Sequence, residues 1–290
     1  MAAAGHPFHP HAFQRGADIV PLMLDERLEA GLLGDMPTLM VASTGMVSIV
    51  GLVKQTATAI VMKGDAQVRD LAGLRVGYVE ASSAHHTLLQ GLSSAGLDEK
   101  SVQLRPLRIN EMPDALERRE IDAFAGWEPA PSLALARSNA NRVVFRGRSS
   151  DYFVLGKRFI EKSPDAAHTV IAGFFRAIDW MRRSRANLEQ AAAWVKTDGA
   201  GFSGKPMPLG IAQIAAITRR EILDIPSAPA LPAGAGTQLL RSEFEFLQRL
   251  GKLPAKGTWK QVEGAFAFGG LARVQSEARK YRLASFDYGD

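Results

Sequence analysis

The sequence predicts an α/β protein, and three observations support that class. Between residues 17 and 155, short apolar runs of strand length alternate with segments that have helical spacing. After Pro164 the chain changes character, and its apolar residues recur only at helical intervals. The composition is 46% hydrophobic and 22% charged over 290 residues, which suits one large globular domain or two moderate ones.

The elements of the α/β region follow from apolar runs and from the turn residues between them. Asp25 is a candidate N-cap, Gly34 and Gly96 are candidate helix ends, and Lys63-Gly64-Asp65 closes a strand. Strands are expected at 17–24, 39–43, 47–53, 58–62, 75–79, 102–107, 121–125, 143–145 and 152–155, with helices at 25–34, 87–95 and 111–119. Later helices are expected at 165–185, 188–197, 209–222 and 237–250, with a Pro- and Gly-rich loop at 227–236.

Composition excludes several classes of function. The chain has no cysteine, which excludes a disulfide scaffold, a Cys-ligated metal and a cysteine nucleophile. The net charge of +5 is too small to indicate nucleic acid, and it suits a small anionic ligand. No apolar run reaches eighteen residues, so no membrane-spanning helix is expected. The first fourteen residues contain no recognisable secretory signal.

Polar residues after the strand at 75–79 are the first candidate site. Ser82 and Ser83 stand where that strand ends and a helix begins, and a helix N-terminus favours an anion. The alternative is that one serine is a simple N-cap. His85 and His86 are adjacent, so they point to different faces of a helix and do not form a paired metal site.

Two further strand ends carry candidate residues. Trp127 and Glu128 follow the strand at 121–125, where an aromatic ring and a carboxylate could contact a ligand. The alternative is a buried tryptophan beside an exposed carboxylate. Ser43 and Thr44 follow the strand expected at 39–43 and form a weaker candidate. No catalytic elbow, P-loop, dinucleotide fingerprint or metalloprotease motif is present, and no catalytic residue, metal ligand or cofactor is predicted.

An ordered set of motifs resembles a known family. Asp70-Leu-Ala-Gly-Leu-Arg-Val-Gly-Tyr-Val-Glu-Ala-Ser-Ser-Ala-His resembles the "D-L-x-G-K-x-V-(G/A)…(G/S)-S-x-x-H" stretch of the solute-binding proteins of nitrate/sulfonate/taurine-type ABC importers. The run from Met112 to Pro129 resembles the family's "A-L-x-x-G-x-I-D-A…W-(E/D)-P", and Tyr152–Pro164 resembles its return strand. The helix 166–185 and the segment 191–194 resemble the helices that follow. The resemblance covers roughly residues 17–200.

The resemblance implies a two-lobed periplasmic-binding-protein-like fold with a ligand cleft between the lobes. Lobe one would comprise residues 1–70 and 149–290, and lobe two residues 71–148. It implies a periplasmic ABC-importer component that captures a small organic anion or zwitterion, such as a sulfonate, taurine or a nitrate-like anion. Its partners would be that ligand and an ABC permease, with no nucleic acid, and the protein would be a monomer. The implied ligand-binding residues are Ser43, Thr44, Ser82, Ser83, His85, Trp127 and Glu128.

The sequence departs from the family pattern in two places. Arg119 stands where the family has glycine, and this is expected to alter only a turn. Only sixteen residues precede the strand expected at 17–24, so the first βα unit is expected to be shortened or absent. The alternatives are an enzyme of the same fold acting on a small sulfonate or a pyrimidine, a ligand-sensing module of a regulator, or a remnant without function.

Overall fold

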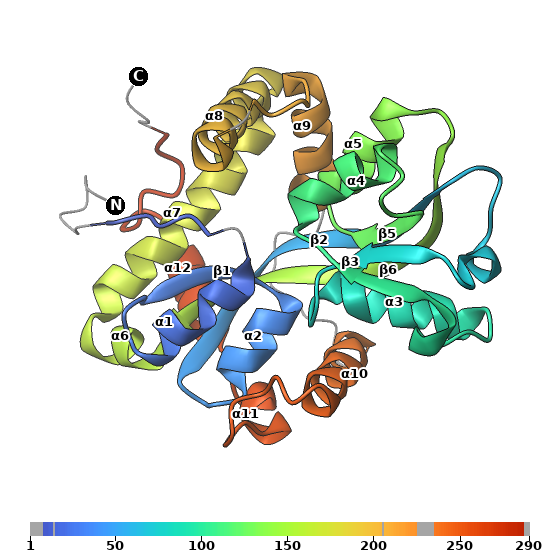
Figure 1. Cartoon of the computed structure of the whole chain (residues 1–290). Coiled ribbons are helices and arrows are strands. Elements are labelled where there is room, and N and C mark those ends of the chain that lie inside the picture. Colours follow the sequence, from blue (N-terminus) through green and yellow to red (C-terminus); the bar gives the residue numbers. More distant parts are fainter. Residues whose placement is uncertain (1–7, 14, 205, 225–234, 287–290) are drawn as a thin grey trace. The chain divides into compact units, whose positions relative to one another are not determined.

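The computed structural model describes residues 8–13, 15–204, 206–224 and 235–286 of the chain (Figure 1). The strands are β1 (Ala30–Gly34), β2 (Val47–Lys63), β3 (Arg75–Tyr78), β4 (Gln103–Pro106), β5 (Ala123–Gly126) and β6 (Asn141–Gly156). The helices of the first half are α1 (Val20–Leu24), α2 (Asp35–Ala42), α3 (Ser83–Ser94), α4 (Met112–Glu117) and α5 (Ala130–Arg137). Those that follow are α6 (Lys157–Lys162), α7 (Pro164–Arg183), α8 (Arg185–Ser203), α9 (Ile211–Thr218), α10 (Ala235–Arg249), α11 (Trp259–Glu263) and α12 (Gly269–Ser276). None of the described helices combines the length and the apolar character that crossing a membrane requires.

The chain divides into two compact units. Unit 1 comprises Met1–Lys54, Asp151–Phe244 and Leu253–Asp290, and unit 2 comprises Gln55–Ser150 and Glu245–Lys252. Residues 55–70, expected in lobe one, fall in unit 2, because the second half of β2 pairs there with β5 over Ala59–Met62. Residues 245–252, at the end of α10 and just beyond it, also fall in unit 2, and the sequence contained no signal for this.

In unit 2, helices cover both faces of a largely parallel set of strands. The described strands are hydrogen-bonded in the order β1-β6-β2-β5-β3-β4, and β3 runs parallel to both β4 and β5. Alternate β5 residues point to opposite faces: Ala123 and Ala125 pack with Leu88 and Leu92 of α3, while Phe124 packs with residues of α4 and α5. Figure 1 shows α3 on one side of these strands and α4 and α5 on the other.

Unit 1 has a core between its strands and two helices. β1 pairs antiparallel with β6, with Ala30 opposite Leu155 and Gly34 opposite Asp151. The core side chains come from β2, β6, α7, α12 and the segment after α12: Val50, Val53, Phe153, Leu155, Ala167, Ile171, Ala172, Leu271, Val274 and Tyr281. The expected helix at 165–185 is confirmed as α7, whose apolar stripe faces this core.

The sequence-based prediction is wrong over residues 17–43. The segment expected as a strand at 17–24 contains α1. Pro21 lies in the first turn of this helix, where a backbone N–H has no partner within the helix, so the missing N–H of proline costs nothing there. The segment expected as a helix contains β1, a Gly- and Leu-containing strand held by its pairing with β6. The strand expected at 39–43 lies mostly within α2, which begins with Asp35 and Met36. The strands expected at 47–53 and 58–62 are one long strand, β2.

Arg119 adopts a left-handed backbone conformation, with φ of 58°. A glycine, the residue that the family pattern has here, takes this conformation without steric cost. The turn still ends α4, and the carbonyl oxygen of Arg119 accepts a hydrogen bond from Arg75 Nη2 at 2.8 Å. Residues 227–234 of the expected loop lie outside the described residues.

Candidate functional site

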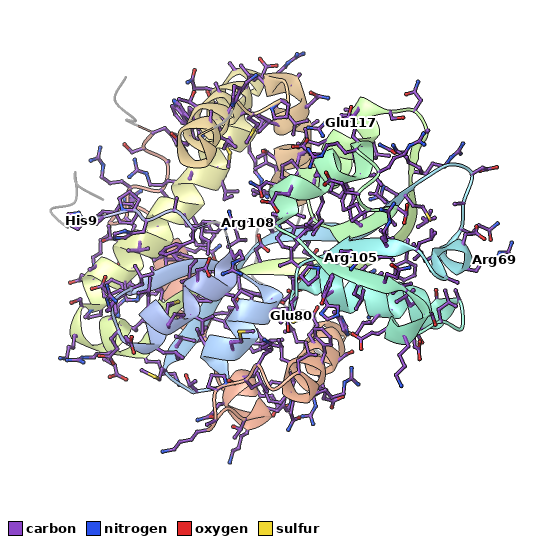
Figure 2. The ribbon with its side chains drawn as sticks, viewed as in Figure 1. His9, Arg69, Glu80, Arg105, Arg108 and Glu117 are labelled. Carbon is purple, nitrogen blue, oxygen red and sulfur yellow. The ribbon has the colours of Figure 1, made fainter. Side chains whose placement is uncertain are left out.

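Three neighbouring strands of unit 2 end at the same edge. β5, β3 and β4 are parallel, so their carboxyl ends point in one direction, and ligands of open α/β sheets bind at such edges. The chain leaves this edge toward α3 after β3, toward Arg108 after β4, and through Trp127 after β5. Glu80 and Arg108, which follow β3 and β4, are labelled in Figure 2. This edge therefore brings together the residues that follow two of the predicted strand ends.

The two serines begin α3. Ser82 is the N-cap, and its Oγ accepts the backbone N–H of His85 at 3.2 Å and donates to the carbonyl oxygen of Val79 at 2.7 Å. Capping is thus one role of Ser82, as the alternative interpretation stated. Ser83 is the first residue of this twelve-residue helix and is partly exposed. The positive end of the helix dipole lies at Ser83 and Ala84, which favours an anion there.

His85 is buried, and both of its ring nitrogens have partners. Nδ1 lies 3.3 Å from the backbone nitrogen of Ala81, and Nε2 lies 3.2 Å from Oε1 of Glu99. The ring packs against Tyr78, at 4.6 Å between centroids, and against Phe246. Burial lowers the pKa of His85, although Glu99 partly opposes this, so the imidazole is neutral at pH 7. Its assignment as a ligand contact remains a prediction.

Trp127 and Glu128 lie directly beyond β5. Trp127 is partly buried against the core that β5 shares with α3. Glu128 precedes a cis peptide bond to Pro129, and its Oε2 accepts the backbone N–H of Ser132 at 3.2 Å, in the first turn of α5. A carboxylate at a helix N-terminus stabilises the helix. Glu128 therefore supports the Pro129 turn, and its contact with a ligand remains a prediction.

Ser43 and Thr44 stand at the end of a helix, which corrects their expected position after a strand. Ser43 is fully buried and donates to the carbonyl oxygen of Met40 at 2.8 Å, while Thr44 donates to that of Val41 at 2.7 Å. Both hydroxyls thereby satisfy carbonyl groups in the last turn of α2. The strand-to-helix junction of this part of unit 1 is at Gly34 and Asp35 instead.

Arg108 is a residue at this edge that the sequence reasoning missed. It follows β4, is exposed, and its guanidinium has no ion-pair or hydrogen-bond partner among the described residues. A cation at the carboxyl edge complements the positive end of α3 in attracting an anion. The sequence did contain a signal for Arg108, because it directly follows the strand predicted at 102–107. The candidate residues after the other two parallel strands were recognised by the same criterion.

Unit 1 contains a cluster of acidic residues that no local motif predicted, and all of them except the partly exposed Asp151 are buried. Asp35 at the start of α2 and Glu243 of α10 are 1% and 0% exposed, and Asp151 of β6 lies opposite Gly34. Lys54 Nζ is 3.8 Å from Asp151 Oδ2 and 3.3 Å from Glu221 Oε2. Burial, reinforced by Asp35, raises the pKa of Glu243 well above its usual value. Burial likewise raises the pKa of Asp151, although Lys54 opposes it.

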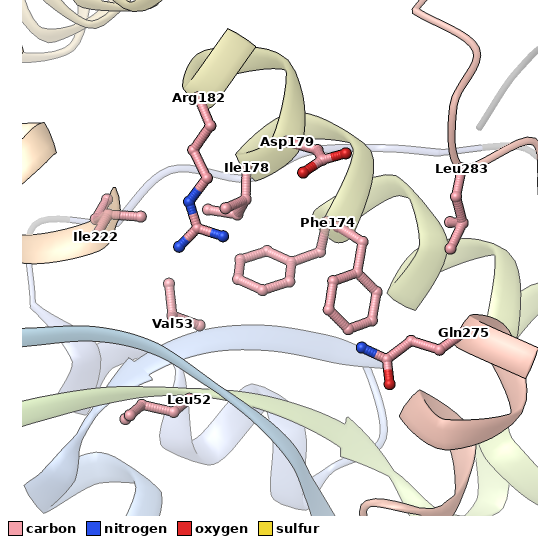
Figure 3. A pocket seen from close by; sticks show the side chains of 10 residues that line it. Leu52, Val53, Phe174, Ile178, Asp179, Arg182, Ile222, Gln275 and Leu283 are labelled. Atoms are coloured by element: carbon pink, nitrogen blue, oxygen red, sulfur yellow. The ribbon is translucent and has the colours of Figure 1, made fainter. Parts of the chain in front are cut away.

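A cavity of about 200 Å³ in unit 1 lies between α7 and β2 (Figure 3). Its apolar side chains include Leu52, Val53 and Ile178. Arg182 is exposed, and its Nη2 donates to the carbonyl oxygen of Leu223 at 2.9 Å. In Figure 3 its guanidinium points from α7 toward Val53. Within the described residues, no group of three histidine, aspartate or glutamate side chains is arranged to hold a metal ion.

Comparison with known proteins identifies a family. The model of the NMT1-like family matches residues 6–196, more than half of the chain. The chain is 27% identical over 207 residues to the "Putative aliphatic sulfonates-binding protein" of Escherichia coli (strain K12), a match covering 68% of this chain and 62% of that protein. The match thus spans less than two thirds of that relative. The chain is also 25% identical over 266 residues to the "Taurine-binding periplasmic protein" of the same organism, covering 84% of this chain and 78% of that one.

Solved structures share the fold. The periplasmic aliphatic sulphonate binding protein SsuA from Escherichia coli superimposes with a TM-score of 0.66 and 24% identity, covering 86% of this chain and 79% of that one. The desulfurization enzyme DSZB superimposes with a TM-score of 0.58 and 15% identity, covering 86% of each chain. The two-lobed α/β class expected from the sequence is the class of these structures. The two relatives in the preceding comparison are both named as binding proteins.

Proposed function

This chain belongs to the NMT1-like family, and from that premise we propose that it binds a small organic anion or zwitterion of the sulfonate, taurine or nitrate kind. The observation that carries the proposal is the carboxyl edge of β5, β3 and β4 in unit 2. Candidate groups come directly after each of these strands in the chain: the N-terminus of α3 after β3, Arg108 after β4, and Trp127 and Glu128 after β5. The names of the two relatives, "Putative aliphatic sulfonates-binding protein" and "Taurine-binding periplasmic protein", support the same class of ligand.

Each residue has a proposed role. Ser83, the adjacent helix end and Arg108 take the anionic group, and Trp127 contacts the apolar part of the ligand. Glu128 takes an ammonium group where the ligand has one. Ser82 and His85 support the site through the hydrogen bonds described above. Ser43 and Thr44 bond carbonyl groups of α2 in unit 1, and direct contact with the ligand remains proposed for all four. The protein acts in the periplasm as a monomer and delivers its ligand to an ABC permease.

We propose binding without turnover. An enzyme on this fold is the rival, and the likeness to DSZB concerns the fold alone. His85 would be its candidate general base, but both ring nitrogens already have partners within unit 2. A general base needs a nitrogen within reach of the substrate proton. The bonding of His85 therefore supports the binding function.

A cognate ligand should stabilise the fold. At 100 times its dissociation constant, a ligand that binds only the native state adds about 2.7 kcal/mol to the free energy of unfolding. For a chain of this size, that raises Tm by roughly 5–10 °C. Thermal unfolding is followed with taurine, ethanesulfonate, nitrate and acetate, and each mixture is afterwards analysed for sulfite and other products. A panel without any shift contradicts the binding proposal, and release of a product supports the enzyme.

The two ends of a zwitterionic ligand should respond to different substitutions. Arg108→Gln removes a cation beside the anionic group, so it should weaken taurine and ethanesulfonate alike, by about tenfold for a charged hydrogen bond of 1.5 kcal/mol. Glu128→Gln should weaken taurine by a similar factor but leave ethanesulfonate unchanged or bound more tightly, because it removes a repulsive carboxylate. Calorimetric titration of both ligands against both variants measures these effects.

The matched control is Arg105→Gln, since Arg105 is an exposed arginine within β4, before the strand end (Figure 2). It removes the same charge from within β4, where the Arg105 side chain is directed back to Gln103 Oε1 at 3.3 Å, so it should change affinity by less than twofold. Glutamine at 128 keeps an oxygen that can accept the N–H of Ser132, so α5 should stay capped. If Glu128→Gln weakens both ligands equally, Glu128 only supports the Pro129 turn. If Arg105→Gln and Arg108→Gln act equally, Arg108 has no local contact with the ligand.

A further inference from the structure

Unit 1 contains a cavity of about 600 Å³ under the N-terminal segment 8–13. The segment crosses α7 in Figure 1, and β1 forms another wall. The volume falls within the usual range for small-molecule sites. The apolar lining side chains come from the segment, β1, β6 and α7 and their neighbours, and they include Phe8, Leu28, Leu32, Phe153, Val170 and Phe174. None of the residues proposed for ligand binding in unit 2 lines it.

As far as the described residues go, the wall formed by residues 8–13 is held by packing alone. Within the described part of the chain, these residues make no hydrogen bond through backbone or side chain. Phe8 is 53% exposed although it also lines the cavity. A segment without hydrogen bonds opens at low free-energy cost. The segment can therefore admit a ligand without disturbing β1 or α7.

The ionisable groups in the lining are all basic. They are His9 and His11 from the segment and Arg176 from α7, and none of the described residues that line this cavity is a carboxylate. Arg176 is held in place, since its Nε donates to the carbonyl oxygen of Ser285 at 2.8 Å. A neighbouring cavity of about 420 Å³ under the same segment adds Arg27 and one carboxylate, Glu29. An apolar interior with a permanently charged guanidinium in its wall complements a hydrocarbon that ends in an anionic group.

We propose that this cavity is a second binding site, which takes an amphiphilic organic anion such as a medium-chain fatty carboxylate. The hydrocarbon chain lies against Leu32, Phe153 and Phe174, and the carboxylate faces Arg176 and the two histidines. The site is separate from the edge in unit 2, and its existence does not depend on the function proposed for that edge.

The test uses dodecanoate as the probe and a substitution that fills the cavity. Gly173 lines the cavity from within α7, so Gly173→Leu places a side chain in the space that the hydrocarbon occupies. Leucine is a better helix former than glycine, so the variant should fold. The matched control is Ala177→Leu, one turn further along α7 at an exposed position that does not line the cavity. Calorimetry below the micellar concentration measures dodecanoate and, as the cationic counterpart, dodecyltrimethylammonium.

Dodecanoate is expected to bind the natural protein at least tenfold more tightly than dodecyltrimethylammonium. Gly173→Leu should weaken dodecanoate at least tenfold, whereas Ala177→Leu should change it less than twofold. Excess ethanesulfonate should not displace dodecanoate. The proposal is overturned by equal binding of the cation, by unchanged affinity in Gly173→Leu, or by displacement with ethanesulfonate. It is also overturned if the protein is a dimer that Gly173→Leu converts to a monomer, because a second copy then occupies the cavity.

Discussion

Replacing Gly147 with alanine is expected to lower the free energy of unfolding by about 3 kcal/mol or more. Overpacking a filled site costs about 1–3 kcal/mol, and leaving a buried hydroxyl without a hydrogen-bond partner costs a similar amount. A Cβ atom at Gly147 would lie 2.1 Å from Thr87 Oγ1 and 2.9 Å from Thr58 Oγ1. These two hydroxyls are buried and 2.5 Å apart, so each is the other's hydrogen-bond partner. The substitution both overpacks this part of unit 2 and separates that pair. Thermal unfolding should show a Tm lower by roughly 6–12 °C.

Two variants test the cause of this loss. Gly51→Ala is the matched control, because a Cβ in that strand glycine would meet nothing closer than Phe153 Cβ at 3.9 Å. It should change stability by less than about 1 kcal/mol. Thr87→Ala removes both side-chain atoms of Thr87 that the new Cβ would meet. In the Gly147→Ala background it should therefore cost less than it costs alone. Equal losses for Gly147→Ala and Gly51→Ala would contradict the steric argument.

Glu243→Gln is expected to stabilise the protein increasingly as the pH rises. Glu243 is fully buried beside Asp35, and burial together with that carboxylate raises its pKa well above the usual value. Between the ordinary pKa of about 4.5 and the raised pKa, the folded state holds a proton that the unfolded state has released. Stability therefore falls with rising pH over this window, by up to about 1.4 kcal/mol per pH unit. Glutamine cannot ionise, so the stability of the variant does not fall with pH for this reason.

Urea unfolding at pH 4.5, 6 and 8 measures the difference between the variant and the natural protein. The gap should be smallest at pH 4.5 and should exceed about 1.4 kcal/mol at pH 8. Glu245→Gln is the control, since it removes the same charge from an exposed position of α10. At pH 8 it should give a smaller gap than Glu243→Gln, because the Glu245 side chain is exposed. A constant gap for Glu243→Gln would mean that Glu243 is ionised in the folded protein throughout this range.

The sequence alone predicted the three parallel strands of unit 2 and its helices α3 and α4, but it missed α5. The runs 75–79, 102–107 and 121–125 are each short, apolar and bounded by turn residues, and they form β3, β4 and β5. Helix α3 begins at Ser83, earlier than the expected 87, because Ser82 caps it. The candidate site at two of these strand ends was visible for the same reason: in a parallel arrangement, position along the chain determines the edge at which a residue lies.

Tertiary structure alone decided the rest. Residues 17–43 contain apolar runs that fit a helix or a strand equally well, and pairing with β6 made a strand of 30–34 instead of 17–24. Ser43 and Thr44 consequently lie at a helix end, not at a strand end. The carboxylates of Asp35 and Glu243 are distant in sequence and meet only in the folded unit. A local sequence pattern shows whether apolar residues recur at the spacing of a helix or of a strand. It does not show which other segments a helix or strand packs against. The burial and the pKa of its polar groups depend on those contacts.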